Sequence, residues 1–125
     1  MSEQDPISVA NRWIKAYNEY DFDTIRELCA PDIKMEHHNR GATANGADEV
    51  IGLMEAFKGM VTERGFHDTR RQFTDGERVV TEQSWTVDPT VDLPGFTGAG
   101  ERLTLELCCV WTVRNGQIHE YDDYG

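Results

Sequence analysis

The chain has 125 residues, which is enough for one domain around a single hydrophobic core and too few for two. Acidic residues outnumber basic ones by 23 to 12, and the formal net charge is −11. Because lysine occurs only at positions 15, 34 and 58, the sequence lacks the basic surface that nucleic acids require. It also lacks an apolar run of about 18 residues and a basic-then-apolar leader, so we expect neither a membrane span nor a secretory signal.

The three cysteines, Cys29, Cys108 and Cys109, do not have the spacing of a metal site. Cys108 and Cys109 are neighbours, and neighbouring strand residues point to opposite faces, so we do not expect a disulfide between them. Reduced thiols predict a cytoplasmic protein. The pair His37-His38 predicts no metal site either, because adjacent strand residues diverge and no third ligand has a suitable spacing.

The N-terminal part of the chain has the pattern of helices. Asp5-Pro6 combines a capping side chain with proline at the first helical position, and apolar residues then recur at helical spacing through Trp13 and Tyr17. Asp21 is expected to cap a second, short helix. Further along we expect a strand at 33–38, a loop at 39–45 and a third helix that starts near 46–48 and ends by Gly65.

From Phe66 onward the pattern changes to the period of two that is typical of strands. The predicted strands cover 67–74, 78–87 and 103–113, with a last strand that runs almost to the C-terminus. The long stretch 88–100 is either a rim or lid over a site or a flexible connection. Three helices followed by a mostly antiparallel sheet predict one α+β domain over residues 1–125, in which helices on the concave face of a strongly curved sheet enclose a conical pocket.

The last strand has an unusual density of titratable groups. It follows the hairpin signal Asn115-Gly116 and contains His119, Glu120, Tyr121, Asp122 and Asp123. If the partner strand offers an apolar face, some of these groups point into an apolar cavity, where small enzymes carry out proton chemistry.

Two registers of this hairpin are possible, and they turn opposite faces inward. A two-residue turn pairs Val113 with Ile118 and places Asp123 opposite Cys108. A three-residue loop, 114–116, pairs Leu107 with Asp123 and turns His119, Tyr121 and Asp123 toward the apolar face. The pattern alone favours the two-residue turn, because that register hides Ile118.

Several segments, in their order and spacing, resemble the nuclear transport factor 2-like superfamily and, within it, the SnoaL-like branch. They are Trp13-Ile14-Lys15-Ala16-Tyr17, 21–28, Ala30-Pro31-Asp32-Ile33, 46–51, 75–80, Asn115-Gly116-Gln117-Ile118 and Tyr121-Asp122-Asp123-Tyr124. The resemblance implies a cone-like α+β domain with a deep pocket, often a homodimer and usually without a cofactor. The superfamily includes ketosteroid isomerases, polyketide cyclases and epoxide hydrolases, so the fold alone does not settle the activity.

The resemblance also assigns roles to single residues. The general base of the ketosteroid isomerases corresponds to His37, but their oxyanion-hole tyrosine and aspartic acid correspond to Trp13 and to the vicinity of Cys109. Two of those three roles are therefore lost.

The final catalytic aspartate of the epoxide hydrolases corresponds to Asp123, but their arginine and first aspartate correspond to Ser84 and Thr86. Polyketide cyclases of the SnoaL type need only a cavity acid/base, which His37 and Asp123 could supply. The inward aspartate of the hydrolases is the reason why we choose the three-residue register.

These observations predict a small enzyme that performs general acid/base chemistry, of the cyclase, isomerase or dehydratase type, on an apolar, carbonyl-bearing small molecule without a cofactor or metal. His37 would be the base and Asp123 its orienting partner or the proton donor. His119, expected beside Trp111 on the same face, is a second candidate base and a candidate substrate-binding residue. The expected pocket walls are Trp13, Tyr17, Trp111 and Tyr121. The alternatives are a binding or assembly protein without turnover, or an epoxide hydrolase with a degenerate site.

We also expect a homodimer built on the outer face of the sheet, because the outward residues of the chosen register are partly apolar. This outward set is Glu106, Cys108, Val110, Thr112, Ile118 and Tyr124.

Overall fold

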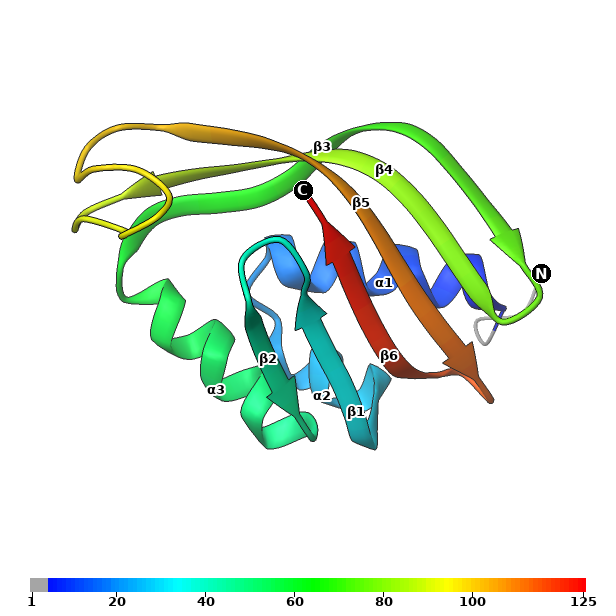
Figure 1. Ribbon diagram of the computed structural model, residues 1–125. Coiled ribbons are helices and arrows are strands. Elements are labelled where there is room, and N and C mark those ends of the chain that lie inside the picture. Colours follow the sequence, from blue (N-terminus) through cyan, green and yellow to red (C-terminus); the bar gives the residue numbers. More distant parts are fainter. Residues whose placement is uncertain (1–4) are drawn as a thin grey trace.

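The computed structural model describes residues 5–125, which form three helices and one six-stranded sheet. Figure 1 shows the sheet curling around α1, with α3 beside the short strands at one end. The strand order is β2-β1-β6-β5-β4-β3, and all neighbours are antiparallel except β1 and β6. The elements are α1 (Pro6–Asn18), α2 (Phe22–Leu28), β1 (Cys29–His37), β2 (Ala42–Asn45), α3 (Ala47–Lys58), β3 (Val61–Asp75), β4 (Arg78–Pro89), β5 (Leu103–Arg114) and β6 (Gln117–Tyr124). The α+β prediction is confirmed.

The two predicted N-caps hold the starts of the first helices. The Asp5 carboxylate accepts a hydrogen bond from the backbone N–H of Ser8 at 3.4 Å, and the Asp21 carboxylate accepts one from that of Thr24 at 3.2 Å. Each cap satisfies a donor that the first helical turn leaves unpaired. The helix α1 then buries Trp13, which is 1% exposed, against the concave face of the sheet.

Two predictions in the middle of the chain are wrong, the loop at 39–45 and the start of the next strand at 67. The stretch predicted as a loop contains β2, whose Ala-rich sequence lacks an alternating apolar pattern and which pairs with the end of β1. The third helix ends at Lys58, within the predicted limit, but the strand predicted from 67 starts earlier, because residues from Val61 onward pair with the end of β4. This early strand start brings Arg64 into the sheet.

The last hairpin combines features of both registers. Arg114 pairs with Gln117 around a two-residue turn in which Asn115 and Gly116 have φ of 53° and 77°, so the predicted three-residue loop is wrong. One residue later the register shifts, because His119 is an extra residue in β6.

This bulge changes the faces of β6. Beyond it Cys109, not Leu107, pairs with Asp123. Ile118 and Asp123 therefore both lie inside, at 0% and 2% exposure. The prediction that Ile118 belongs to the outer face is wrong for the same reason.

Among the described residues, no helix has both the length and the apolar character needed to cross a membrane.

Candidate functional site

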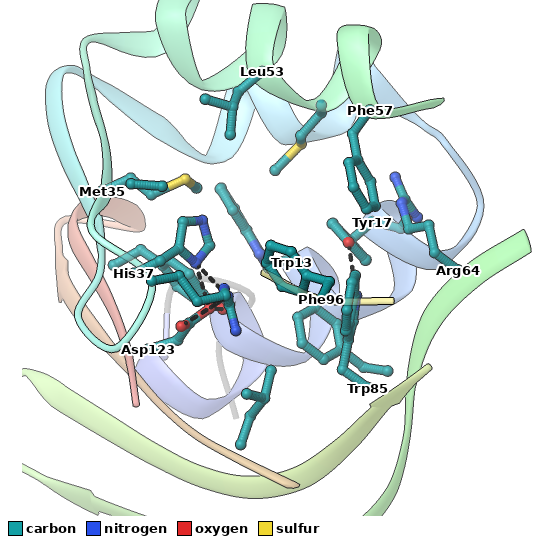
Figure 2. A pocket seen from close by; sticks show the side chains of 16 residues that line it. Trp13, Tyr17, Met35, His37, Leu53, Phe57, Arg64, Trp85, Phe96 and Asp123 are labelled. Atoms are coloured by element: carbon teal, nitrogen blue, oxygen red, sulfur yellow. Dashed lines mark hydrogen bonds and ion pairs between the residues drawn. The ribbon is translucent and has the colours of Figure 1, made fainter. Parts of the chain in front are cut away.

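A cavity of about 240 Å³ lies between the helices and the concave face of the sheet. Figure 2 shows His37 and Asp123 at one end of it, and Tyr17, Arg64 and Trp85 at the other. Most of the lining is apolar or aromatic, as is usual for small-molecule sites. The lining residues are Trp13, Tyr17, Met35, His37, Arg40, Ala42, Leu53, Met54, Phe57, Arg64, Phe66, Trp85, Phe96, Leu107, Tyr121 and Asp123.

The pairing of β1 with β6 brings His37 and Asp123 together. These parallel strands place the two residues directly beside each other, although they are 86 positions apart in the chain. His37 Nδ1 lies 2.7 Å from Asp123 Oδ2, and the two side chains are 18% and 3% exposed. The geometry required of an acid/base pair is therefore present.

Arg40, which the sequence analysis missed, completes this cluster. It lies in the tight turn after β1, where the backbone N–H groups of Arg40 and Gly41 both donate to the carbonyl oxygen of His37. Its Nη2 lies 3.1 Å from each carboxylate oxygen of Asp123 and 2.8 Å from His37 Nδ1. A buried carboxylate needs a cation or several hydrogen-bond donors, so the inward position of Asp123 was the signal that an arginine belongs nearby.

Burial alone would raise the pKa of Asp123. The hydrogen bond and charge of His37, the charge of Arg40 and a hydrogen bond from the Tyr121 hydroxyl, 3.1 Å away, outweigh it and hold the pKa below its ordinary value. Asp123 is therefore ionised at neutral pH. The pKa of Tyr121 is raised by burial and by Cys109 and Asp123, so its hydroxyl keeps its proton and can serve as the donor.

The ionised carboxylate fixes the tautomer of a neutral His37. Nδ1 cannot donate to Asp123 and accept from Arg40 at the same time. A donor beside the carboxylate is favoured electrostatically, so we assign the proton to Nδ1, and Arg40 donates to the carboxylate oxygens instead. The Nε2 atom is then an unprotonated acceptor, and Figure 2 shows it on the side of the ring that faces away from Asp123.

Two of the predicted pocket residues lie elsewhere. Trp111 is fully buried behind Tyr121, with ring centroids 5.5 Å apart, and does not line the cavity. His119 is the bulge residue, so its side chain leaves the apolar face and lies 4.0 Å from the exposed Asp32. By contrast Trp13, Tyr17 and Tyr121 line the cavity as predicted.

The far end of the cavity is built by α1, β3 and β4. Trp85 Nε1 donates to the Tyr17 hydroxyl oxygen at 2.9 Å, and burial raises the pKa of Tyr17 to about 12 although the nearby charge of Arg64 lowers it. Phe96, from the long connection between β4 and β5, lines the cavity, and its neighbour Leu93 is buried. This connection therefore forms part of the rim.

Metal-ligating side chains gather at one place among the described residues. Glu36, His38 and Asp122 offer ligand atoms within 4.8 Å of one another, but none of them lines the cavity. Both ring nitrogens of His38 already lie within hydrogen-bond distance of the carboxylates, at 3.0 Å from Glu36 and 2.7 Å from Asp122. An ion-pair network accounts for this cluster.

The chain belongs to the SnoaL-like domain family, whose pattern matches residues 10–121. No curated protein matches the chain with significance.

Solved structures share its fold over nearly the whole length. A putative polyketide cyclase from Xanthomonas campestris pv. campestris has a TM-score of 0.84 at 19% identity, covering 99% of this chain and 93% of its own. An LEH-like epoxide hydrolase of M. tuberculosis has a TM-score of 0.74 at 22% identity, covering 95% and 80%. An NTF2-like protein of unknown function from Burkholderia pseudomallei has a TM-score of 0.79 at 22% identity, covering 99% and 91%. At these identities the likeness establishes the cone-shaped fold.

Proposed function

We propose that this protein is a small enzyme that performs cofactor-free acid/base chemistry on an apolar molecule containing a carbonyl group. One observation supports this most: His37 is hydrogen-bonded through Nδ1 to an ionised aspartate, and its ring faces a largely apolar cavity. Aldol cyclisation, isomerisation through an enolate, and dehydration next to a carbonyl can each begin with removal of a proton from carbon by such a base. The names of the structural neighbours include cyclases and a hydrolase, which agrees with small-molecule chemistry in this fold.

In the proposed reaction, His37 Nε2 takes a proton from the carbon next to the substrate carbonyl. The C–H electron pair moves into the carbonyl to give an enolate, and His37 becomes an imidazolium that Asp123 stabilises. If a carbon–carbon double bond adjoins the deprotonated carbon, the enolate extends over it and takes the proton back from His37 at its far carbon. If the substrate has a second carbonyl, the enolate attacks that carbonyl to close a ring, and the resulting alkoxide takes the proton. In both cases His37 returns its proton, so no cofactor is consumed.

Arg40 is suited to stabilise the enolate oxygen. Its Nη2 is engaged by Asp123, but its Nη1 is buried and has no hydrogen-bond partner among residues 5–125. A charged donor in an apolar cavity stabilises developing negative charge better than water does, because it needs no reorganisation during the reaction. Arg40 would thus act on Asp123 with one nitrogen and on the substrate with the other.

Mass spectrometry of small molecules released from the purified protein identifies candidate ligands, and their deuterium uptake in D2O tests turnover. We expect the wild type to catalyse exchange at carbon, and His37→Ala to slow it by about 10²–10⁴-fold, the usual contribution of a positioned base. His38→Ala is the matched control, because His38 does not line the cavity. Its ring stacks on that of Tyr124, with the ring centroids 4.3 Å apart. A ligand that binds without any exchange would instead support a binding or assembly protein.

Epoxide hydrolysis has less support. Ser84, which corresponds to the arginine of that catalytic set, donates to Glu106 at 2.9 Å and accepts from Arg70 at 3.1 Å. Neither Ser84 nor Thr86 lines the cavity.

A further inference from the structure

Arg64 is a buried arginine at the opposite end of the cavity from His37 (Figure 2). The residue is 4% exposed. One guanidinium nitrogen, Nη1, donates to the backbone carbonyl oxygen of Tyr17 near the end of α1. The guanidinium carbon lies 3.6 Å from the ring centroid of Tyr17 and 4.0 Å from that of Tyr20, so the cation is held between two aromatic faces.

This arginine has no carboxylate partner within the described part of the chain. Six of the nine arginines form ion pairs, and they are Arg26, Arg40, Arg70, Arg71, Arg102 and Arg114. Of the three that do not, only Arg64 is buried. The absence is unexpected because the chain has almost twice as many acidic as basic residues.

The contacts within the protein leave part of Arg64 unexplained. The carbonyl oxygen of Tyr17 is the hydrogen-bond partner of Nη1, and the rings of Tyr17 and Tyr20 explain the position of the guanidinium plane. The other nitrogen, Nη2, is buried and has no hydrogen-bond partner among residues 5–125. A buried charged donor without a partner is costly and calls for an explanation, and a ligand in the cavity that Arg64 lines would supply the missing partner.

We propose that Arg64 Nη2 binds a carboxylate of the ligand, so that the substrate is a small apolar carboxylic acid whose reacting carbonyl lies at His37. This inference rests on the proposed function for the position of the reacting end. A monoanion fits best, because it balances the single guanidinium charge, whereas a phosphate dianion would leave excess charge among apolar walls. The cavity of about 240 Å³ is below the common range of about 300–1,000 Å³, which also favours a small ligand.

Matched pairs of probes test the carboxylate directly. We would measure the binding of 2-naphthoate, 1-naphthoate and 4-phenylbutanoate, each against its neutral amide, by titration calorimetry. A charge-assisted hydrogen bond in an apolar site predicts that at least one acid binds about tenfold or more tightly than its amide. If no acid binds more tightly than its amide, including the case in which nothing binds, the proposal is overturned.

Variants locate the effect. Arg64→Gln should abolish the preference for the acid, while Arg64→Lys should retain part of it. Arg78→Gln is the matched control, because Arg78 is exposed, belongs to none of the ion pairs and carries the same charge. Circular dichroism confirms folding of each variant, and a preference for the acid that survives in folded Arg64→Gln would contradict the proposal.

The two proposals can fail separately. His37→Ala should keep the preference for the acid, because the carboxylate binds at the other end of the cavity. Loss of proton exchange in His37→Ala with an unchanged preference in Arg64→Gln would remove only the Arg64 proposal. A preference that depends on Arg64, together with full exchange in His37→Ala, would remove only the catalytic one.

Discussion

Asp123 is a carboxylate in an apolar interior, and its ionised form depends on three neighbours. His37, Arg40 and Tyr121 all have donors within 3.1 Å of its oxygens. Together they outweigh the cost of burial. The same carboxylate orients the His37 ring through the hydrogen bond to Nδ1.

The lowered pKa of Asp123 predicts a loss of stability in acid. Folding favours the ionised form, so its contribution is present above the ordinary pKa of about 4 and is lost as the pH falls through the lower, folded-state value. In Asp123→Asn this part of the pH dependence should disappear. Urea unfolding between pH 7 and pH 3 measures it. Asp32→Asn, at a side chain 88% exposed, is the control and should retain the wild-type slope.

The β5–β6 hairpin is the element on which the site depends. Its two-residue turn hides Ile118, and the bulge at His119 then changes the face, so that Tyr121 and Asp123 also lie inside. Ile118 and Asp123 would lie on opposite faces of a regular strand, and the bulge allows both to lie inside. His119 is left outside the cavity as a consequence.

Replacing glycine with alanine should have opposite effects at Gly116, which has a left-handed conformation, and at Gly52, which is helical. With φ of 77°, Gly116→Ala should lower the free energy of unfolding by about 1 kcal/mol. Gly52 lies on the exposed side of α3, where an added Cβ meets nothing within 4 Å, so Gly52→Ala should raise the free energy of unfolding by about 0.5–1 kcal/mol. Chemical denaturation measures both, and a destabilised Gly52→Ala or an unaffected Gly116→Ala would contradict this account.

The helices and the fold could be predicted because their signals are local. The caps at Asp5 and Asp21 and the apolar spacing of α1 need no knowledge of distant residues. The bulge could not be predicted, because the turn signal Asn115-Gly116 fixes the register only at the turn. The inward position of Asp123 was predicted only from the resemblance to the epoxide hydrolases.

Two arginines of the cavity escaped the sequence analysis for related reasons. Arg40 lies in a stretch without periodicity, and its direction is set by the pairing of β1 with β2. Arg64 lies before the predicted strand at 67–74, and its place in β3 depends on pairing with β4. Tertiary contacts decide both positions, and single-chain patterns do not contain them.

At the scale of the whole molecule, the outer face of the sheet suggests self-association. Val110 and Cys108 are partly exposed there on β5, and Tyr124 is 44% exposed on β6. We propose a homodimer that covers this face, because partly apolar sheet faces commonly form interfaces.

Light scattering at micromolar concentration should give twice the mass of 14.2 kDa. Val110→Arg places a charge in the proposed interface and should give the mass of one chain with the fold retained. A monomeric wild-type protein would refute the dimer.

In the proposed reaction His37 and Asp123 act as one catalytic unit, and a double-mutant cycle tests this coupling most directly. The measurement is the rate of substrate deuterium exchange in the wild type, His37→Ala, Asp123→Asn and the double variant. We predict that each single change costs about 10²-fold or more, and that the double variant is no slower than His37→Ala, because residues that share one transition state are not additive. Losses below about tenfold, or losses that multiply in the double variant, would contradict the claim.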